Sequence, residues 1–128
     1  MTKFDSGRLG RGAAYVSDPS GSRHAKFMQL SARALIPLGL LAAWFVVGVA
    51  GKSYEAAHAY LGRPFPAIAL IAFVAVAMPH AAAGAETIIE DYVHDDALKR
   101  RALAANRWAA KIVALAWVAG IVLIAAAK

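Results

Sequence analysis

The 128-residue sequence predicts an all-α membrane protein with three transmembrane helices in a bundle. Hydrophobic residues make up 60% of the chain, against about 45–50% in ordinary soluble domains. Charged residues make up only 17%, against about 25%. The hydrophobic residues are gathered in three stretches, 35–51, 65–85 and 112–127. With its flanks, each stretch reaches the roughly 20 residues that a helix needs to cross a hydrocarbon core of about 30 Å.

Residues at the ends of these stretches predict where the helices begin and end. Gly51 closes the first stretch, Pro64 and Pro66 suit the first turn of the second, and Trp108 is placed for a membrane interface at the start of the third. The predicted helices are about 28–50, 66–92 and 104–127. We therefore expect a flexible cytoplasmic arm, residues 1–27, followed by a three-helix anchor domain, residues 28–128.

The distribution of Lys and Arg predicts the orientation of the chain. Six of these residues lie in 1–33 and four in 91–108, whereas 51–64 contains two and the C-terminus only Lys128. Basic residues beside membrane spans accumulate on the cytoplasmic side. The N-terminus is therefore expected in the cytoplasm and the C-terminus outside.

The net charge of +6 does not indicate a nucleic-acid-binding protein. Its basic residues lie at membrane flanks without interleaved aromatic residues, and topology and anionic lipid account for them. The chain contains no cysteine, which excludes disulfides, thiolate metal sites and a cysteine nucleophile.

The second predicted helix carries a histidine in an apolar stretch. At 100° per residue, His80 and Asp91 differ by about 20° after whole turns, so they share a face and lie about 16 Å apart along the axis. Phe73, Ala77, Gly84 and Thr87 fall close to this stripe, and Pro79 and the small residues 81–84 leave room for a flat group beside the imidazole. An ionisable group near the middle of a membrane is costly and usually functional. His80 is therefore either a cofactor ligand or a partner in an interhelical hydrogen bond.

The other candidate residues have ordinary structural interpretations. Tyr92 is typical of an interfacial aromatic belt, and Asp91 of a solvated helix end. His24 is placed in the arm, and His58 and His94 are interpreted as loop residues.

Two motifs resemble a known family. The pattern H-x3-G-x6-D-Y, formed by His80, Gly84, Asp91 and Tyr92 on the second of three helices, resembles the small hydrophobic anchor subunit of succinate dehydrogenase, respiratory complex II. The segment LSARALIPLGL, which begins at Leu30, is similar to the TA-x-AL-I-P-L segment of the first helix in that family. The resemblance covers about residues 21–128.

The resemblance implies roles for individual residues. His80 would be the axial ligand of the iron in a heme b shared with a second anchor subunit. Tyr92 would donate a hydrogen bond to a ubiquinone carbonyl, and Asp91 would organise that pocket or its proton supply. Support of the heme or quinone pocket would come from Gly84, Arg33, Gln29 and Ser31. The family commonly has an arginine at the position of Gln29. Arg33, one helical turn further on, is placed to replace that arginine. His24 resembles a histidine that the family has just before the first helix.

The implied function is that of a membrane anchor in succinate:ubiquinone oxidoreductase, not itself catalytic towards succinate, that helps to pass electrons from an iron–sulfur subunit to quinone. Its expected partners are that subunit, a flavoprotein subunit, a second cytochrome b-type anchor subunit and the lipid of a bacterial cytoplasmic (inner) membrane, and no nucleic acid. The alternatives are a fumarate reductase anchor and a non-redox three-helix accessory protein in which His80 only bonds another helix.

Overall fold

The computed structural model describes residues 19–127, which form four helices and no strand. They are α1 (Pro19–Val49), α2 (Tyr54–Leu61), α3 (Pro64–Tyr92) and α4 (Asp96–Ala126). Three of them, α1, α3 and α4, are long and apolar enough to cross a membrane. This confirms the prediction of an all-α chain with three candidate membrane-spanning helices.

Two of the spanning helices begin earlier than predicted. α1 starts at Pro19 instead of near Met28, and α4 starts at Asp96 instead of near Ala104. Both added segments are polar, so a prediction based on hydropathy stops short of them. Local chemistry nevertheless supports helix there, because a proline suits the first turn of α1 and the Asp95 carboxylate accepts a hydrogen bond from the backbone N–H of Leu98 at 2.7 Å. Residues 1–18 of the predicted arm lie outside the described part of the chain.

The short helix α2 was not predicted. The Ser53 hydroxyl caps its start by accepting from the backbone N–H of Ala56 at 3.3 Å, and the N–H of Gly62 closes its end on the carbonyl of His58 at 2.9 Å. His58 is therefore a helical residue and not the loop residue that we expected. Eight residues are too few to show a clear helical period in the sequence.

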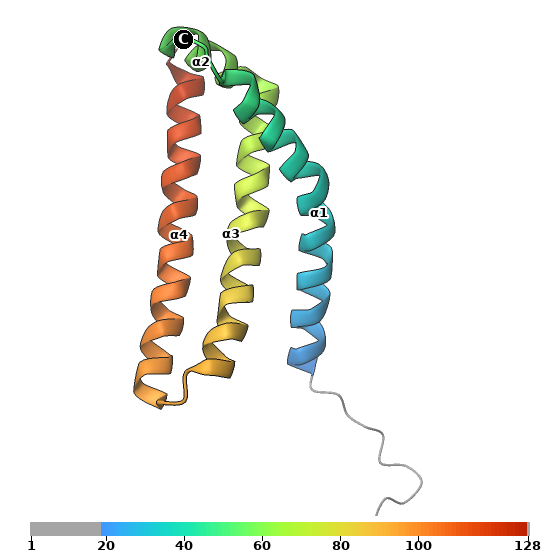
Figure 1. Cartoon of the computed structure of the whole chain (residues 1–128), viewed down its shortest axis with the longest axis vertical. Helices are drawn as coiled ribbons and strands as arrows, with labels where there is room; N and C mark the ends of the chain where they lie inside the picture. Colours follow the sequence, from blue (N-terminus) through green and yellow to red (C-terminus); the bar gives the residue numbers. More distant parts are fainter. Residues whose placement is uncertain (1–18, 128) are drawn as a thin grey trace, which may run out of the picture.

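α3 is the central helix, and the spanning helices form a row. α1 and α4 both pack against α3 but, within residues 19–127, not against each other, as Figure 1 illustrates. The bundle that the sequence predicts is thus assembled around α3, with α1 and α4 each packed on it. In lipid no hydrophobic force draws α1 towards α4, and helices associate where small or polar residues allow close contact.

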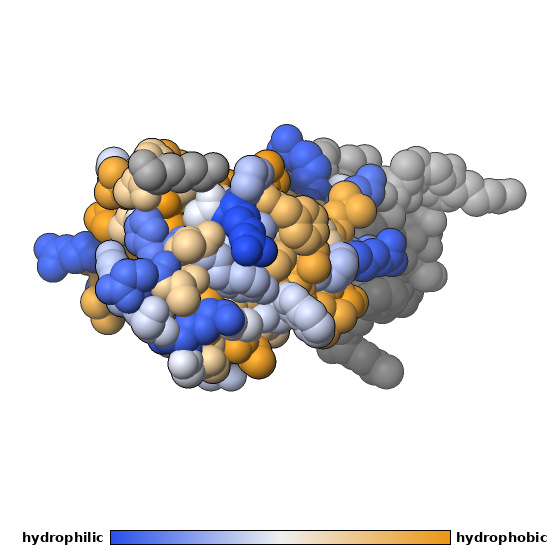
Figure 2. Space-filling view, turned by 90° about the horizontal axis from the view of Figure 1, so that it is seen from above, coloured by the Kyte–Doolittle hydropathy of each residue, from blue (hydrophilic) through white to orange (hydrophobic). Residues whose placement is uncertain are grey.

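The two ends of the row carry different connections. The start of α1 and the α3–α4 connection lie at one end, and α2 and the end of α4 lie at the other (Figure 1). A view onto the α2 end shows hydrophilic and hydrophobic residues interspersed, with orange hydrophobic residues along much of the rim (Figure 2). Hydrophobic side chains on the flanks suit contact with lipid.

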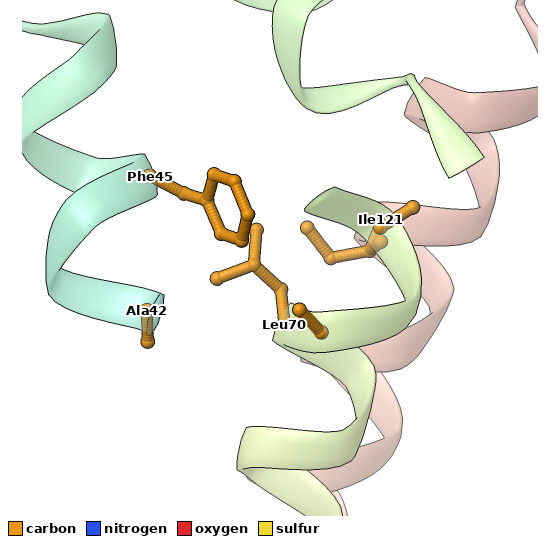
Figure 3. Packing of buried hydrophobic residues seen from close by; sticks show 6 residues of the cluster. Ala42, Phe45, Leu70 and Ile121 are labelled. Carbon is orange, nitrogen blue, oxygen red and sulfur yellow. The ribbon is translucent and has the colours of Figure 1, made fainter. Parts of the chain in front are cut away.

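The hydrophobic core lies in the half of the molecule next to α2. Phe45 of α1 points towards Leu70 of α3, with Ile121 of α4 beyond it (Figure 3). The Phe45 ring also makes edge contacts with Phe65 and Tyr60, at centroid distances of 5.7 and 6.2 Å. We call this the core half: residues 35–49 of α1, 64–77 of α3 and 112–126 of α4. The remainder of the three helices is the open half, where Ser31 is the only buried residue among those whose burial is described.

Candidate functional site

The centre of the candidate site is a direct contact between α1 and α3. The Ser31 Oγ of α1 lies 2.7 Å from the Nδ1 of His80 on α3. Ser31 is 6% exposed and His80 is half-buried. The same Oγ is 2.7 Å from the backbone oxygen of Phe27 and 3.3 Å from that of Met28. In the described chain, the His80 side chain has no other hydrogen bond, so its Nε2 has no protein partner there.

The predicted stripe on α3 faces α1. Phe73 lies 3.9 Å from the place where a Cβ on Gly39 would stand, and a Cβ on Gly84 would lie 3.8 Å from the Cε of Met28. His80 is between these two contacts along α3. The shared face of Phe73, His80 and Gly84 is thus confirmed, and it is the face turned towards the first helix.

The predicted space beside the imidazole is only partly present. Gly84 faces the flexible end of Met28 at an ordinary van der Waals distance, so the helices approach without a tight fit at this glycine. A groove of about 320 Å³ lies instead along Pro79 and the small residues Ala82 and Ala83, and it is lined by α3, α4 and Phe27 of α1. His80 does not line this groove.

Polar contacts tie α3 to α4 in the open half. The Asn106 amide donates to the carbonyl of Ala82 at 2.8 Å. Arg107 Nε donates to Glu86 Oε1 at 2.6 Å, and the Lys99 ammonium donates to the carbonyl of Glu90 at 3.1 Å. Polar side chains bond across helices where lipid offers no other partner. The sequence analysis missed these contacts, because Arg107 was counted only as a topological charge, although Glu86 and Arg107 are complementary in sign.

The proposed quinone residues lie at the far end of α3. Tyr92, the last residue of the helix, is 76% exposed, and Asp91 is also exposed. At about 1.5 Å per residue, Tyr92 is roughly 18 Å from His80 along the axis. Neither side chain has a hydrogen bond within residues 19–127. Their predicted roles at a quinone site stay predictions.

The remaining predicted residues are not gathered around His80. Gln29 and Arg33 are each two positions from Ser31, which turns them towards the side of α1 away from α3, and both are exposed. His24 is exposed on α1, and His94 lies in the α3–α4 connection as expected. The structure therefore brings together Ser31, His80 and Gly84, and it leaves the other candidates on outer surfaces.

His80 has the chemistry required of a single axial ligand. A neutral imidazole binds a metal through the nitrogen that lacks a proton, while its other nitrogen bonds a neighbouring group. His80 has one nitrogen on Ser31, and its other nitrogen has no partner in the described part of the chain. No set of three or more His, Cys, Asp or Glu side chains in the described residues could hold a metal ion. The residues present thus fit a group that takes one ligand from this chain.

Comparisons with known proteins identify the family. Residues 9–124 match the family of succinate dehydrogenase/fumarate reductase transmembrane subunits. The chain is also 42% identical over 72 residues to the succinate dehydrogenase hydrophobic membrane anchor subunit of Paracoccus denitrificans. That match spans 56% of each chain, so the similarity extends over about half of the relative. No solved structure matches this chain. The chain, with its three apolar helices and a central histidine, belongs to the succinate dehydrogenase/fumarate reductase transmembrane subunit family.

Proposed function

We propose that the protein is a membrane anchor subunit of succinate:ubiquinone oxidoreductase. The observation that carries the proposal is the family match over residues 9–124, on a chain whose His80 keeps Nε2 without a partner among residues 19–127. Its partners are a flavoprotein subunit, an iron–sulfur subunit and a second cytochrome b-type anchor subunit. The complex lies in a bacterial cytoplasmic membrane.

The proposed orientation places the N-terminus and the α3–α4 connection in the cytoplasm. The Lys and Arg bias supports it, with six such residues in 1–33 and four in 91–108. The start of α1 and the α3–α4 connection lie at the same end of the row, so one side of the membrane accommodates both basic regions. The C-terminus then faces outward.

His80 is the proposed axial ligand of heme b in this complex. A bound heme supplies one-electron redox chemistry between the iron–sulfur subunit and quinone. The chain contributes the imidazole nitrogen, the Ser31 contact that orients the ring, and the small residue Gly84 on the same face of α3. The second anchor subunit would supply the opposite ligand.

The heme assignment is tested with His80→Ala in the whole complex. We expect the variant to lose the low-spin heme signal in reduced-minus-oxidised spectra, because one axial bond is removed, while α3 stays inserted. The matched control is His94→Ala, which removes an exposed histidine from the α3–α4 connection. An unchanged low-spin spectrum in the His80 variant contradicts ligation and favours a helix-bonding role alone.

Tyr92 and Asp91 are the proposed contribution to the quinone site. A phenol at the end of α3 can donate to a quinone carbonyl while its ring stays in apolar surroundings, and a neighbouring carboxylate can relay the protons that quinone reduction consumes. A site built around a hydrogen bond discriminates strongly when the donor is removed. We expect Tyr92→Phe to lower ubiquinone reduction while succinate oxidation with a soluble artificial acceptor stays intact.

The control for this experiment is Tyr54→Phe. Tyr54 is 77% exposed, close to the 76% of Tyr92, but it lies at the opposite end of the row. If Tyr92→Phe keeps the wild-type ratio of quinone-linked to artificial-acceptor activity, Tyr92 does not bind quinone and is an interfacial aromatic residue. The family also includes fumarate reductase subunits. The two assignments are separated by comparing two rates in the purified complex: succinate oxidation with ubiquinone, and fumarate reduction with a low-potential quinol. A faster rate of fumarate reduction would identify the complex as a fumarate reductase.

A further inference from the structure

We infer that Ser31 is a positioning residue that holds His80 in the tautomer with its proton on Nδ1, which leaves the lone pair on Nε2. The tautomer follows from contacts within this chain. The consequence for iron binding rests on the proposed function.

The hydrogen count at Ser31 determines the tautomer. A hydroxyl has one hydrogen to donate and two lone pairs to accept with, and a backbone carbonyl oxygen can only accept. Ser31 Oγ lies 2.7 Å from the Phe27 carbonyl oxygen, so its hydrogen is directed there. The 2.7 Å contact with His80 Nδ1 is then a hydrogen bond only if Nδ1–H donates to Oγ. If Ser31 donated its hydrogen to Nδ1 instead, the Ser31 Oγ and the Phe27 carbonyl oxygen would lie 2.7 Å apart with no hydrogen between them.

The surroundings make this arrangement persistent. Ser31 is the only buried polar residue whose burial the structure describes, at 6% exposure. Lipid offers no replacement hydrogen bond, so breaking the contact leaves a polar group unpaired in an apolar medium. The glycines on either side, Gly39 of α1 opposite Phe73 and Gly84 of α3 opposite Met28, leave room for the two helices to approach near this bond.

The same bond tunes the free nitrogen as a ligand. An acceptor on the outer N–H of a metal-bound histidine fixes its ring and raises its basicity, and loss of that acceptor typically costs about 10–100-fold in metal affinity. A more basic imidazole favours ferric over ferrous iron. Removal of the Ser31 hydroxyl should therefore weaken heme retention and raise the heme reduction potential.

The tautomer is tested first, without heme. In the full chain in lipid bilayers, ¹⁵N-histidine solid-state NMR reports which ring nitrogen carries the proton, and the His80 signals are assigned by their absence in His80→Ala. We expect Nδ1–H for His80 in the wild type, a mixture of tautomers in Ser31→Ala, and recovery of Nδ1–H in Ser31→Thr, which restores a hydroxyl. A wild-type His80 protonated on Nε2, or an unchanged spectrum in Ser31→Ala, overturns the inference.

The ligand consequence is tested in the purified complex by spectroelectrochemical titration of the heme. Ser31→Ala should raise the potential, because the less basic imidazole stabilises ferric iron less. A tenfold change in the ratio of ferric to ferrous affinity would appear as a shift of about 59 mV for a one-electron couple. Ser31→Thr should return the potential towards the wild-type value. An unchanged potential in Ser31→Ala contradicts the tuning role. Absence of heme from the wild-type complex contradicts the proposed function instead, and the NMR result then stands separately.

Discussion

The core half and the open half of the molecule are held together by different interactions. Residues 64–77 of α3 bury five side chains, Pro66, Ala67, Ala69, Leu70 and Val74, against the neighbouring elements. Residues 78–92 of the same helix bury none, and they are tied by separate polar contacts to α1 and α4. One helix thus passes from close apolar packing to a series of hydrogen bonds.

This difference concerns where the helices bury one another. In the core half, Leu70 and its neighbours are buried between the helices, although large apolar side chains such as Trp44 and Ile68 still face outward, at 72% and 67% exposure. In the open half, residues 78–92 bury no side chain, and Leu30 and Ile88 are 65% and 61% exposed. Every residue predicted for the heme or quinone site is in the open half. A cofactor held by these residues is therefore expected there and not around Leu70.

The largest expected effect is a truncation in the core half. Phe45 is 4% exposed, whereas its neighbour Trp44 is 72% exposed. Phe45→Ala should destabilise the folded chain by about 3–5 kcal/mol, because it leaves a cavity between α1, α2 and α3. Trp44→Ala, the control, should cost far less. Thermal unfolding in detergent measures both, and equal losses would contradict the burial of Phe45 in the core half.

Glycine substitutions compare packing tightness beside the core half with that in the open half. Gly62, at the end of α2, faces Ile124 of the core half. A Cβ on Gly62 would lie 3.0 Å from the backbone oxygen of Ile124, which cannot move aside as a side chain can. Gly62→Ala should therefore cost about 1–3 kcal/mol through overpacking. Gly84→Ala faces Met28 at 3.8 Å and should be tolerated. The same unfolding assay ranks the two variants, and a larger loss at Gly84 would show that the open half is the tighter one.

The smallest expected effect is the loss of one polar contact in the open half. Asn106→Leu removes the donor to Ala82 but retains a similar volume. Interhelical hydrogen bonds in membranes average about 0.6 kcal/mol, so the unfolding midpoint should shift only slightly. Ala105→Leu is the control for the added apolar surface at an exposed neighbouring position. A loss as large as that of Phe45→Ala would mean that polar contacts dominate the stability of the row.

The sequence predicts the parts of this fold that depend on local pattern. Hydropathy identifies the three spans, and helical geometry places Phe73, His80 and Gly84 on one face. Hydropathy does not reveal that α1 and α4 extend beyond the apolar stretches, because those polar extensions depend on local features such as the Asp95 cap. α2 is too short for its period to be visible.

The site was predictable only in part, for a related reason. His80 stands out because an ionisable group in an apolar span is costly. Its contact with Ser31 depends on how α1 and α3 align, and the two residues are 49 positions apart in the sequence. Ser31 entered the prediction only through the family resemblance. The two interpretations of His80, interhelical bond or ligand, also prove compatible, since an imidazole has two nitrogens and the structure uses one.

The central position of α3 has a consequence for how the chain is made. Chains emerge from the ribosome N-terminus first, and α1 packs on α3, so α1 enters the bilayer before its only long partner exists. α4 is synthesised last and docks on the opposite side of α3. The order of synthesis therefore builds the row from one edge across its centre, and a chain truncated before residue 64 would leave α1 as a single unpaired helix exposed to membrane proteases.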